Sequence, residues 1–235
     1  MEYEIVLATG NPGKASEIIE ILAARGGPSG KLKVITIKDA VGYAPDADED
    51  SETLRGNAWK KVRAAERALR EHNAGSGIAH IIVADDSGLF VDCLGGRPGV
   101  RSARYGAGYA PAGSNGATVV PPPEKQIEML LAEIREKNAR VSPRTDLIGP
   151  GRTASFKCYI AIVYPDGSTG CAGGEIKGEI ALRPAGCGGF GYDPVFWLPQ
   201  IGKTMAELSE NEKNAISHRG IAIRRMACDI DLHIA

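Results

Sequence analysis

Several features that would point to particular protein classes are missing from this sequence of 235 residues. No apolar run approaches the roughly 20 residues that a membrane-spanning helix needs. The N-terminus, Met1-Glu2-Tyr3-Glu4, is acidic and leads straight into an apolar run, unlike a secretory signal. The 28 Lys and Arg residues are balanced by 29 Asp and Glu residues, so no overall field attracts nucleic acid or an anionic membrane. We therefore expect a cytoplasmic protein with neither nucleic acid nor membrane as a partner.

Patterns typical of metal clusters, disulfides and repeats are missing too. The five cysteines, at positions 93, 158, 171, 187 and 228, form no Cys-x-x-Cys pair, which argues against a zinc site and favours reduced thiols. Four scattered histidines supply no His-Asp metal cluster. We find no internal repeat. The remaining composition, with 43% apolar and 24% charged residues, is that of a globular protein with one large domain or two small lobes.

The spacing of apolar residues predicts an α/β protein with a mixed sheet. Strands are expected at 5–8, 32–37, 78–83, 156–164 and 168–182. Helices are expected around 15–22, 54–69 and 127–134 and at the C-terminus; the inner face of the first would hold Ala15, Ile18, Ile19 and Leu22. Surface loops are expected at 106–123 and 138–152. We expect a single domain over residues 1–235.

A hairpin makes this sheet mixed. Pro165-Asp166-Gly167 is typical of a tight turn between two antiparallel strands. The return strand is expected to be broken at Gly173-Gly174. A sheet that holds such a hairpin is not purely parallel.

Two adjacent carboxylates follow the predicted strand at 78–83. In Ala84-Asp85-Asp86-Ser87-Gly88, side chains alternate between the two faces of a strand, so Asp85 and Asp86 should point to opposite sides. Buried carboxylates are costly unless they are paired, hydrogen-bonded or bound to a cation. Either one of them faces a cleft and the other anchors nearby backbone, or the pair belongs to an Asx turn that ends the strand.

A loop between the first strand and the first helix could bind an anion. It consists of Thr9, Gly10, Asn11, Pro12, Gly13 and Lys14. Backbone N–H groups and the positive end of the helix dipole favour a phosphate at a helix N-terminus, and Lys14 adds a charge. The loop lacks the spacing of a Walker A motif. The alternative is an ordinary turn between strand and helix.

Three further stretches contain candidate ligand-binding residues. Residues 46–52 hold five acids, which are either a solvated face or a source of carboxylates for a divalent cation. Residues 186–194 are rich in glycine and include Phe190 and Tyr192, which could stack on a base or fill the core. A lone His on a helix is usually just a satisfied polar group, but His218 lies beside Arg219 and near Lys213, which makes a pocket for an anionic or carbonyl-bearing ligand plausible.

Taken together and in this order, the motifs resemble one protein family. The sequence contains Thr-Gly-Asn-x-Gly-Lys at 9–14, Ala-Asp-Asp-Ser-Gly-Leu at 84–89, Leu-Gly-Gly-x-Pro-Gly at 94–99, Ser-Ala-Arg-Tyr at 102–105, Gly-Gly-Phe-Gly-Tyr-Asp-Pro at 188–194 and Ser-His-Arg-Gly at 217–220. From Ile5 to about Met226 the chain resembles the inosine triphosphate pyrophosphatase family, also called the Ham1 family. Each motif is weak alone, and the set is specific.

The resemblance implies a fold, an activity and partners. The fold would be an elongated α/β structure, with a long central mixed sheet, flanked by helices, as the floor of a cleft between two lobes. The enzyme would cut inosine, deoxyinosine and xanthosine triphosphates between the α and β phosphates, giving the monophosphate and pyrophosphate. Mg²⁺ would be the cofactor and a homodimer the expected assembly. The tracts 106–123 and 138–152 are longer than is usual for the family and carry no site motif.

The resemblance also implies roles for residues of this chain. Glu49 and Asp86 match the metal-linked carboxylates, with Asp86 as the general base. Residues 9–14 would hold phosphates. The nucleotide pocket would be lined by Ser87, Phe190, Gly191, Tyr192, Asp193, Lys213, His218 and Arg219.

Base choice would depend on hydrogen-bond donors. Inosine and xanthosine carry an oxygen at purine C6 where adenosine carries an amino group, so a donor from Arg219 or a neighbouring backbone N–H would accept the former and reject the latter. If Arg219 is not that donor, the Phe190–Asp193 loop is the next candidate.

Two other function classes compete with this prediction. A nucleotide-binding regulator would keep the phosphate loop but would not need Asp85, Asp86 and the acidic run together. A dimetal hydrolase of another fold would need metal clusters that the histidines do not supply.

Overall fold

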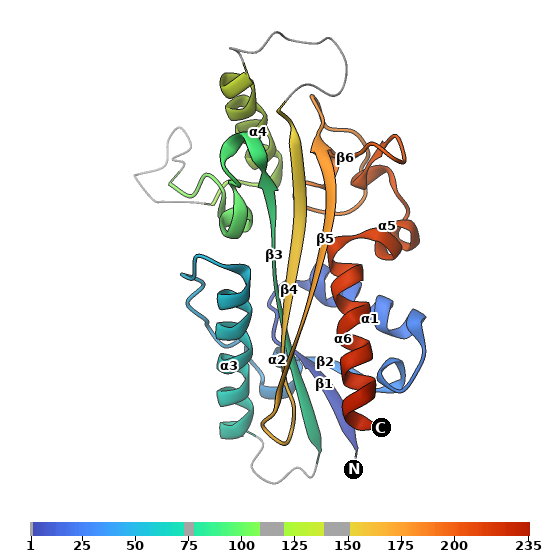
Figure 1. Cartoon of the computed structure of the whole chain (residues 1–235). Helices are drawn as coiled ribbons and strands as arrows, with labels where there is room; N and C mark the ends of the chain where they lie inside the picture. The colour runs from blue at the N-terminus through green and yellow to red at the C-terminus, as the bar shows by residue number, and fades with distance from the viewer. Residues whose placement is uncertain (1, 73–77, 109–119, 139–150) are drawn as a thin grey trace. The chain divides into compact units, whose positions relative to one another are not determined.

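A computed structural model describes residues 2–72, 78–108, 120–138 and 151–235 (Figure 1). The strands are β1 (Tyr3–Leu7), β2 (Lys33–Thr36), β3 (Ala79–Val91), β4 (Thr153–Val163), β5 (Thr169–Ile180), β6 (Phe196–Leu198) and β7 (Lys203–Thr204). The α-helices are α1 (Pro12–Arg25), α2 (Ile37–Val41), α3 (Leu54–His72), α4 (Pro123–Asn138), α5 (Glu210–Ile216) and α6 (His218–Ile234). Within the described ranges, no helix is both long and apolar enough to cross a membrane.

The strands form one mixed sheet in the order β2-β1-β3-β4-β5-β6-β7. Strand β1 pairs in parallel with both β2 and β3, whereas β6 pairs antiparallel with β5 and β7. Strands β4 and β5 are joined by a turn that Tyr164 and Gly167 close with backbone hydrogen bonds. The expected mixed α/β fold with helices on the sheet is therefore confirmed.

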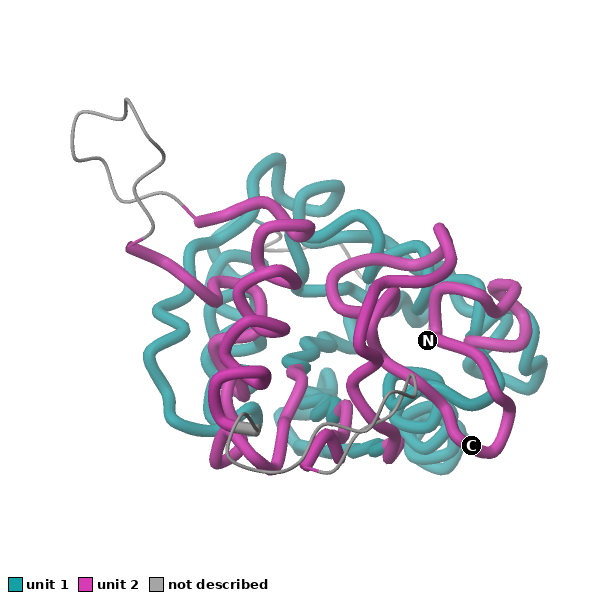
Figure 2. The backbone as a smooth tube through the Cα atoms, turned by 90° about the horizontal axis from the view of Figure 1, so that it is seen from above, with its two compact units in different colours: residues 1–87, 157–175, 214–235 teal, residues 88–156, 176–213 magenta. Residues whose placement is uncertain are grey.

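The chain divides into two compact units (Figure 2). Unit 1 contains residues 1–87, 157–175 and 214–235, and unit 2 contains residues 88–156 and 176–213. Strands β3, β4 and β5 each contribute residues to both units. The expected cleft between two lobes stays a prediction.

In unit 1, helices cover both faces of the sheet, as Figure 1 shows for α3 on one side and α6 on the other. Alternate residues of β1 and of the position directly after it separate the two layers: Ile5 and Leu7 pack with α1 and α6, while Val6 and the following Ala8 pack with α2 and α3. The same alternation continues in β3 with Ile81 and Ile82. Because a strand has a period of two, the side of each later residue in β3 is fixed by this register.

In unit 2, α4 buries the four apolar residues that its spacing predicts, Ile127, Leu130, Leu131 and Ile134. Phe156 of β4 packs on Phe196 of β6 with ring centroids 4.5 Å apart. The other described residues of this unit include the ends of β3 and β5, strand β7, the start of α5, several short 3₁₀ helices and the loops that join them.

Strand β3 is longer than expected, and the alternative of an Asx turn that ends the strand at Asp85-Asp86 is wrong. The strand runs through both residues to Val91, so the two carboxylates lie inside it and do not end it. Gly88 is needed there for close packing, because a Cβ at this position would lie 2.2 Å from the backbone oxygen of Gly99. Ser87-Gly88 therefore resembles a turn sequence although both residues belong to the strand, where Gly88 allows close packing.

Two other expectations are corrected. Strand β5 continues without a break through Gly173-Gly174. Ile19 is 39% exposed, and the inner face of α1 instead carries Ile21 beside Ala15, Ile18 and Leu22. The ends of the predicted loop 106–123, at 106–108 and 120–122, are turn or irregular, and its centre lies outside the described residues. Most of the second predicted loop, 138–152, also lies outside the described residues.

Candidate functional site

The N-terminus of α1 is capped and exposed. The side chain of Asn11 caps the helix by accepting a hydrogen bond from the backbone N of Lys14 at 3.2 Å, and Pro12 occupies the first helical turn. Residues 10–13 are exposed. The positive end of the dipole of this 14-residue helix, with a lysine in its first turn, would favour a phosphate here.

Asp85 points from β3 toward α1 and α6. Its side chain is fully buried, and its Oδ2 accepts hydrogen bonds from Lys14 Nζ at 2.8 Å and from Arg219 Nε at 3.4 Å. Burial raises the pKa of Asp85, but Lys14 and Arg219 outweigh it and hold the pKa well below its usual range. Asp85 is therefore an ionised anchor for two cations.

Arg219 is the centre of this buried network. Besides Asp85, its guanidinium donates to Glu17 of α1 and, through Nη2, to the Ser87 hydroxyl at 2.9 Å. Only 2% of its side chain is exposed. Burial lowers its pKa, but Asp85 and Glu17 reverse this and raise the pKa of Arg219. The structure thus brings Lys14, Ser87 and Arg219 together around Asp85.

Asp86 points to the opposite face, toward α3, as the alternation of the strand predicts. Its Oδ1 accepts a hydrogen bond from Lys61 Nζ at 3.0 Å and its Oδ2 accepts one from Asn57 Nδ2 at 3.2 Å. Burial is the largest influence and raises the pKa of Asp86, although Lys61 and Lys14 act to lower it. A carboxyl group whose pKa lies above its usual range is suited to accept a proton.

Lys61 links this carboxylate to the acidic segment. Its Nζ lies 3.1 Å from Glu49 Oε2, so one ammonium group joins Glu49 and Asp86. Burial lowers the pKa of Lys61, but Asp86, Asp85 and Glu49 outweigh this and raise it. The structure therefore brings together Glu49 and Asp86, the two carboxylates that the family resemblance links, through Lys61.

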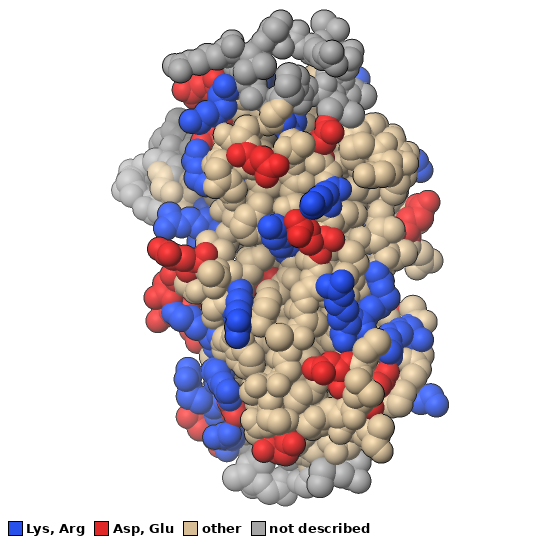
Figure 3. Space-filling view, in the orientation of Figure 1, with Lys and Arg blue, Asp and Glu red and all other residues tan. Residues whose placement is uncertain are grey.

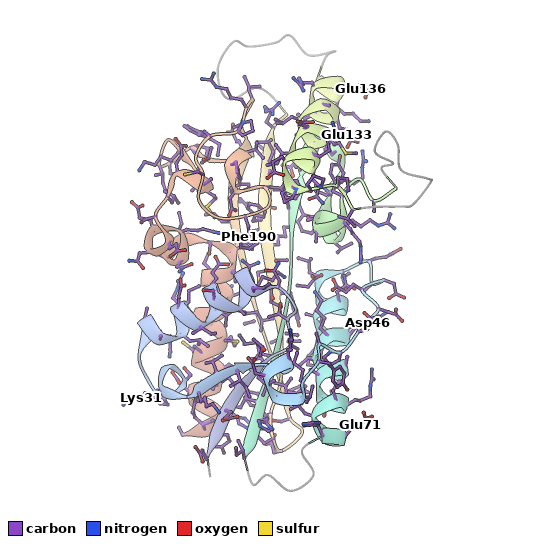
Figure 4. All side chains as sticks on the ribbon, turned by 180° about the vertical axis from the view of Figure 1, so that it is seen from behind. Lys31, Asp46, Glu71, Glu133, Glu136 and Phe190 are labelled. Carbon is purple, nitrogen blue, oxygen red and sulfur yellow. The ribbon has the colours of Figure 1, made fainter. Side chains whose placement is uncertain are left out.

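The rest of the acidic segment is solvated. Asp46, Asp48, Asp50 and Glu52 are exposed, and Figure 4 labels Asp46 in the segment that precedes α3. Asp50 forms an ion pair with Lys60 on the surface of α3. Most of residues 46–52 are therefore a solvated face, whereas Glu49 pairs with Lys61; a role of this segment in binding a divalent cation stays a prediction.

Sequence reasoning missed Asn57 and Lys61. They lie one helical turn apart, next to Ala58 and Val62 of the buried side of α3. Asn57 has no exposed surface. Polar residues on the inner side of an amphipathic helix need buried partners. Their position beside the apolar stripe of the predicted helix could therefore have identified both residues.

The glycine-rich loop of unit 2 is organised by Asp193. Its Oδ2 accepts hydrogen bonds from the backbone N of Phe190 at 2.9 Å and from Lys213 Nζ at 2.8 Å. Lys213 Nζ also lies 4.7 Å from the centre of the Phe190 ring. Phe190, labelled in Figure 4, is 41% exposed. An exposed ring held by a buried ion pair can stack on a flat ligand.

Tyr192 and His218 have different surroundings from Phe190. Tyr192 is 5% exposed and donates its hydroxyl hydrogen bond to the backbone oxygen of Ser102 at 2.9 Å, so it fills the core as the second alternative predicted. Burial raises the pKa of this hydroxyl above its usual range. His218 is also buried and begins α6, directly after the capping residue Ser217.

The chain belongs to the Ham1 family, whose model matches residues 5–228. It is 40% identical over 225 residues to a protein named dITP/XTP pyrophosphatase from Geobacillus kaustophilus, a match that covers 95% of this chain and 92% of the relative. A Bacillus subtilis protein of the same name is 37% identical over 226 residues and covers 95% of each chain. The family predicted from the sequence motifs is therefore confirmed.

Solved structures of the family share the fold. The Ham1 protein of Staphylococcus aureus superposes with a TM-score of 0.72 at 33% identity, covering 98% of this chain and 99% of its own. A Ham1 protein from Coxiella burnetii gives the same TM-score at 34% identity, with full coverage of both chains.

Proposed function

We propose that this protein hydrolyses inosine, deoxyinosine and xanthosine triphosphates to the monophosphate and pyrophosphate. The observation that carries the proposal is the pair of opposed networks on β3. Asp86 is held on one face with Lys61 and Glu49, while Asp85 on the other face holds Lys14 at the exposed end of α1. The names of the relatives from G. kaustophilus and B. subtilis support the substrate class.

Each of these residues would have a distinct task. Water would attack a phosphorus of the anhydride that joins the α and β phosphates, and Asp86 would take the proton that the water loses. Pyrophosphate would leave when that anhydride bond breaks. Lys61 would hold the Asp86 carboxylate in place, and Lys14 with the N–H groups of α1 would bind phosphate oxygens.

Glu49 and Asp86 fit a magnesium ion. Mg²⁺ usually takes one or two carboxylates and completes its shell with waters and substrate phosphates. The described residues contain no group of three or more acidic, His or Cys side chains that could hold a metal alone, which suits an ion shared with the nucleotide. Bound there, Mg²⁺ would neutralise phosphate charge and orient the attacking water.

The surroundings of Arg219 bear on base choice. Its Nε, Nη1 and Nη2 atoms all donate to Asp85, Glu17 or Ser87. A purine oxygen would have to compete with these buried partners for a donor. The geometry therefore supports the Phe190–Asp193 loop over Arg219 as the place of base recognition, with Phe190 stacking on the ring.

A panel of nucleoside triphosphates with Mg²⁺ tests the proposal. We expect pyrophosphate release from the inosine, deoxyinosine and xanthosine nucleotides, strong preference over adenosine triphosphate, and loss of turnover with a chelator. Release of orthophosphate would make the protein another kind of phosphatase. Tight binding without turnover would make it a nucleotide-binding regulator.

Assembly and compartment are further proposals. We propose a homodimer, which sedimentation would test by giving twice the mass of one chain. A reducing compartment such as the cytoplasm suits the five free cysteines, of which Cys171, Cys187 and Cys228 are exposed. Fluorescent tagging and fractionation would test that location.

A further inference from the structure

Asn57 occupies an unusual place for an uncharged polar side chain. It is the fourth residue of α3, and its backbone N–H donates to the backbone oxygen of Thr53 at 3.1 Å. Its own side chain is fully buried. A buried side-chain amide that is left without partners is costly, so its hydrogen bonds show what it is there to hold.

The two ends of the Asn57 amide bind two different parts of unit 1. Nδ2 donates to Asp86 Oδ2 at 3.2 Å, and Oδ1 accepts a hydrogen bond from the backbone N of Ser51 at 3.0 Å. Ser51 follows Glu49 by two residues in the acidic segment. Asn57 therefore joins the strand that carries Asp86 to the segment that carries Glu49.

The amide offers each of these two neighbours the complementary group. The backbone N–H of Ser51 can only donate, and an ionised Asp86 can only accept. Aspartate at position 57 would satisfy Ser51 but would face Asp86 with a second acceptor. Leucine has a similar size and would satisfy neither.

Asn57 also divides the Asp86 carboxylate with Lys61. Lys61 donates a hydrogen bond to Oδ1 and Asn57 donates one to Oδ2, and the two donors lie one turn apart on the same helix. Two donors on a rigid helix fix both the position and the rotation of a carboxylate. One donor would leave the carboxylate free to rotate about its own axis.

We propose that Asn57 is a positioning residue: it fixes the rotation of the Asp86 carboxylate and holds the Glu49 segment beside it. This inference rests on the proposed function, in which Asp86 accepts a proton. Asn57 itself would not touch the substrate. Its effect would reach the reaction through the orientation of Asp86.

The variants Asn57→Asp and Asn57→Leu test the first half of the proposal. They share only the loss of the N–H donor to Asp86, since one adds a charge and the other adds none. We expect kcat for deoxyinosine triphosphate to fall by about 10- to 100-fold in both, as is typical when the partner of a functional group is removed. KM should remain nearly unchanged in Asn57→Asp, because this variant keeps the acceptor for the Ser51 N–H and with it the position of the Glu49 segment.

Hydrogen exchange of residues 48–56 tests the second half. Asn57→Leu removes the acceptor of the Ser51 N–H, so this amide should exchange faster than in the wild type. Asn57→Asp keeps the acceptor, so protection should remain. This measurement needs no substrate and reports on the protein even if the enzyme assay fails.

Glu66→Gln is the matched control. Glu66 is a buried polar residue of the same helix, and its carboxylate accepts hydrogen bonds from Arg63 and Arg70, both at 2.7 Å, away from Asp86. We expect this variant to lose thermal stability and keep the wild-type kcat. An equal fall of kcat in the control would show that any damage to α3 slows the reaction and would overturn the proposal.

Other results would also overturn it. They are a kcat above half of the wild-type value in either Asn57 variant, unchanged Ser51 exchange in Asn57→Leu, or loss of cooperative thermal unfolding in both variants, which would make Asn57 a core residue only. A wild-type protein that releases no pyrophosphate would instead refute the proposed function, and the exchange measurement would still decide the structural half.

Discussion

Adjacent residues of this chain do opposite work, and Asp85 and Asp86 show why. Both are buried carboxylates, yet Asp85 meets Lys14 and Arg219, while Asp86 meets one lysine and one neutral amide. Their pKa values therefore shift in opposite directions, down for Asp85 and up for Asp86. Opposite pKa shifts of this kind support the proposed division, in which Asp85 anchors two cations and Asp86 accepts a proton.

The first prediction concerns Asp86→Asn. Asparagine keeps the shape and loses the charge, so turnover should fall by ~10²–10⁴-fold, the usual cost of losing a general base. Because burial disfavours the charged form of Asp86, the fold should survive. Pyrophosphate release and thermal unfolding, measured together, check both statements. A variant that keeps more than about a tenth of the wild-type rate would remove Asp86 from the role of base.

The second prediction concerns stability at low pH through Asp231. This carboxylate binds Arg25 and the backbone N of Ser29, the latter at 2.6 Å from Oδ1. Partial burial raises the pKa of Asp231, but these hydrogen bonds outweigh it and hold the pKa below its usual range. A group with a lowered folded-state pKa stabilises above its unfolded-state pKa of about 3.9, and this stabilisation is lost as pH falls through the folded-state value.

Asp231→Asn should therefore lower the Tm at pH 5–8, and the difference from the wild type should shrink as the pH falls below about 4. Thermal unfolding across this range is the measurement. Glu71→Gln is the control, at the exposed end of α3 labelled in Figure 4, and it should change the Tm little at any pH. A difference between Asp231→Asn and the wild type that is independent of pH would show that packing, and not charge, is lost.

Among the elements, the side chains of β3 point alternately to its two faces, and the helices on each face form a separate polar network with them. Helix α1 contributes Lys14 and α6 contributes Arg219 on one face, while α3 contributes Asn57 and Lys61 on the other. The strand provides both acids and keeps them apart. Elements distant in the sequence are thus joined by two consecutive residues.

The N-terminus of α1 gives the third prediction. Lys14→Met should weaken triphosphate binding more than monophosphate binding, because the helix N–H groups remain and only the added charge is lost. Titration calorimetry with both nucleotides is the measurement, and thermal unfolding is needed beside it because Asp85 loses a partner. Equal weakening for both ligands would contradict a role of Lys14 in binding the outer phosphates.

The packing of β5 on α6 gives the fourth prediction. A Cβ at Gly174 would lie 2.0 Å from the backbone oxygen of His218 and 2.8 Å from the backbone N of Ala222. Gly174→Ala should therefore push β5 from the start of α6, disturb Arg219 and lower both stability and activity. At the adjacent Gly173, the nearest atom would be 3.7 Å away, so Gly173→Ala is a matched control that should be tolerated. Similar Tm values for the two variants would contradict this account.

The sequence predicts features that depend on neighbouring residues better than features that depend on contacts between distant elements. The strand predicted at 5–8, the helix predicted around 15–22 and the opposite directions of Asp85 and Asp86 follow from local periodicity, and the structure has β1 at Tyr3–Leu7, α1 at Pro12–Arg25 and the two acids on opposite faces. The continuation of β3 through Gly88 depends on Gly99, and the unbroken β5 depends on α6. Such glycines look like turns because the backbone that fills their space belongs to another element.

The candidate site shows the same limit. The predicted pairing of Glu49 with Asp86 came from the family resemblance, while Lys61, which joins them, went unnoticed. A lysine in a helix is ordinarily a solvated residue, and only the three-dimensional structure shows that its ammonium group faces a strand 24 residues further along the chain.

At the scale of the whole molecule, charge is balanced and dispersed. The formal net charge is −1 at pH 7, and Figure 3 shows Lys and Arg side chains interspersed with Asp and Glu on the face in view. The net charge is therefore too small to produce a large field of one sign that would attract a triphosphate from a distance. Attraction of the substrate must come from a few local groups, among which Lys14 at the exposed end of α1 is the best placed.

The last prediction follows from this balance. Long-range steering falls steeply with ionic strength, whereas contacts at short distance are screened much less, since the Debye length is about 10 Å at 0.1 M salt. We expect kcat/KM for deoxyinosine triphosphate to fall by less than about tenfold between about 0.05 and 0.5 M salt at constant free Mg²⁺.

A pair of surface exchanges separates net charge from local charge. Lys31→Glu with Lys137→Glu would change the net charge from −1 to −5, at two units for each exposed lysine. If attraction is local, this double variant should keep nearly the wild-type kcat/KM at low salt, while Lys14→Met, which changes the charge by one unit, should lower it. A larger loss in the double variant than in Lys14→Met would show that the field of the whole molecule guides the substrate.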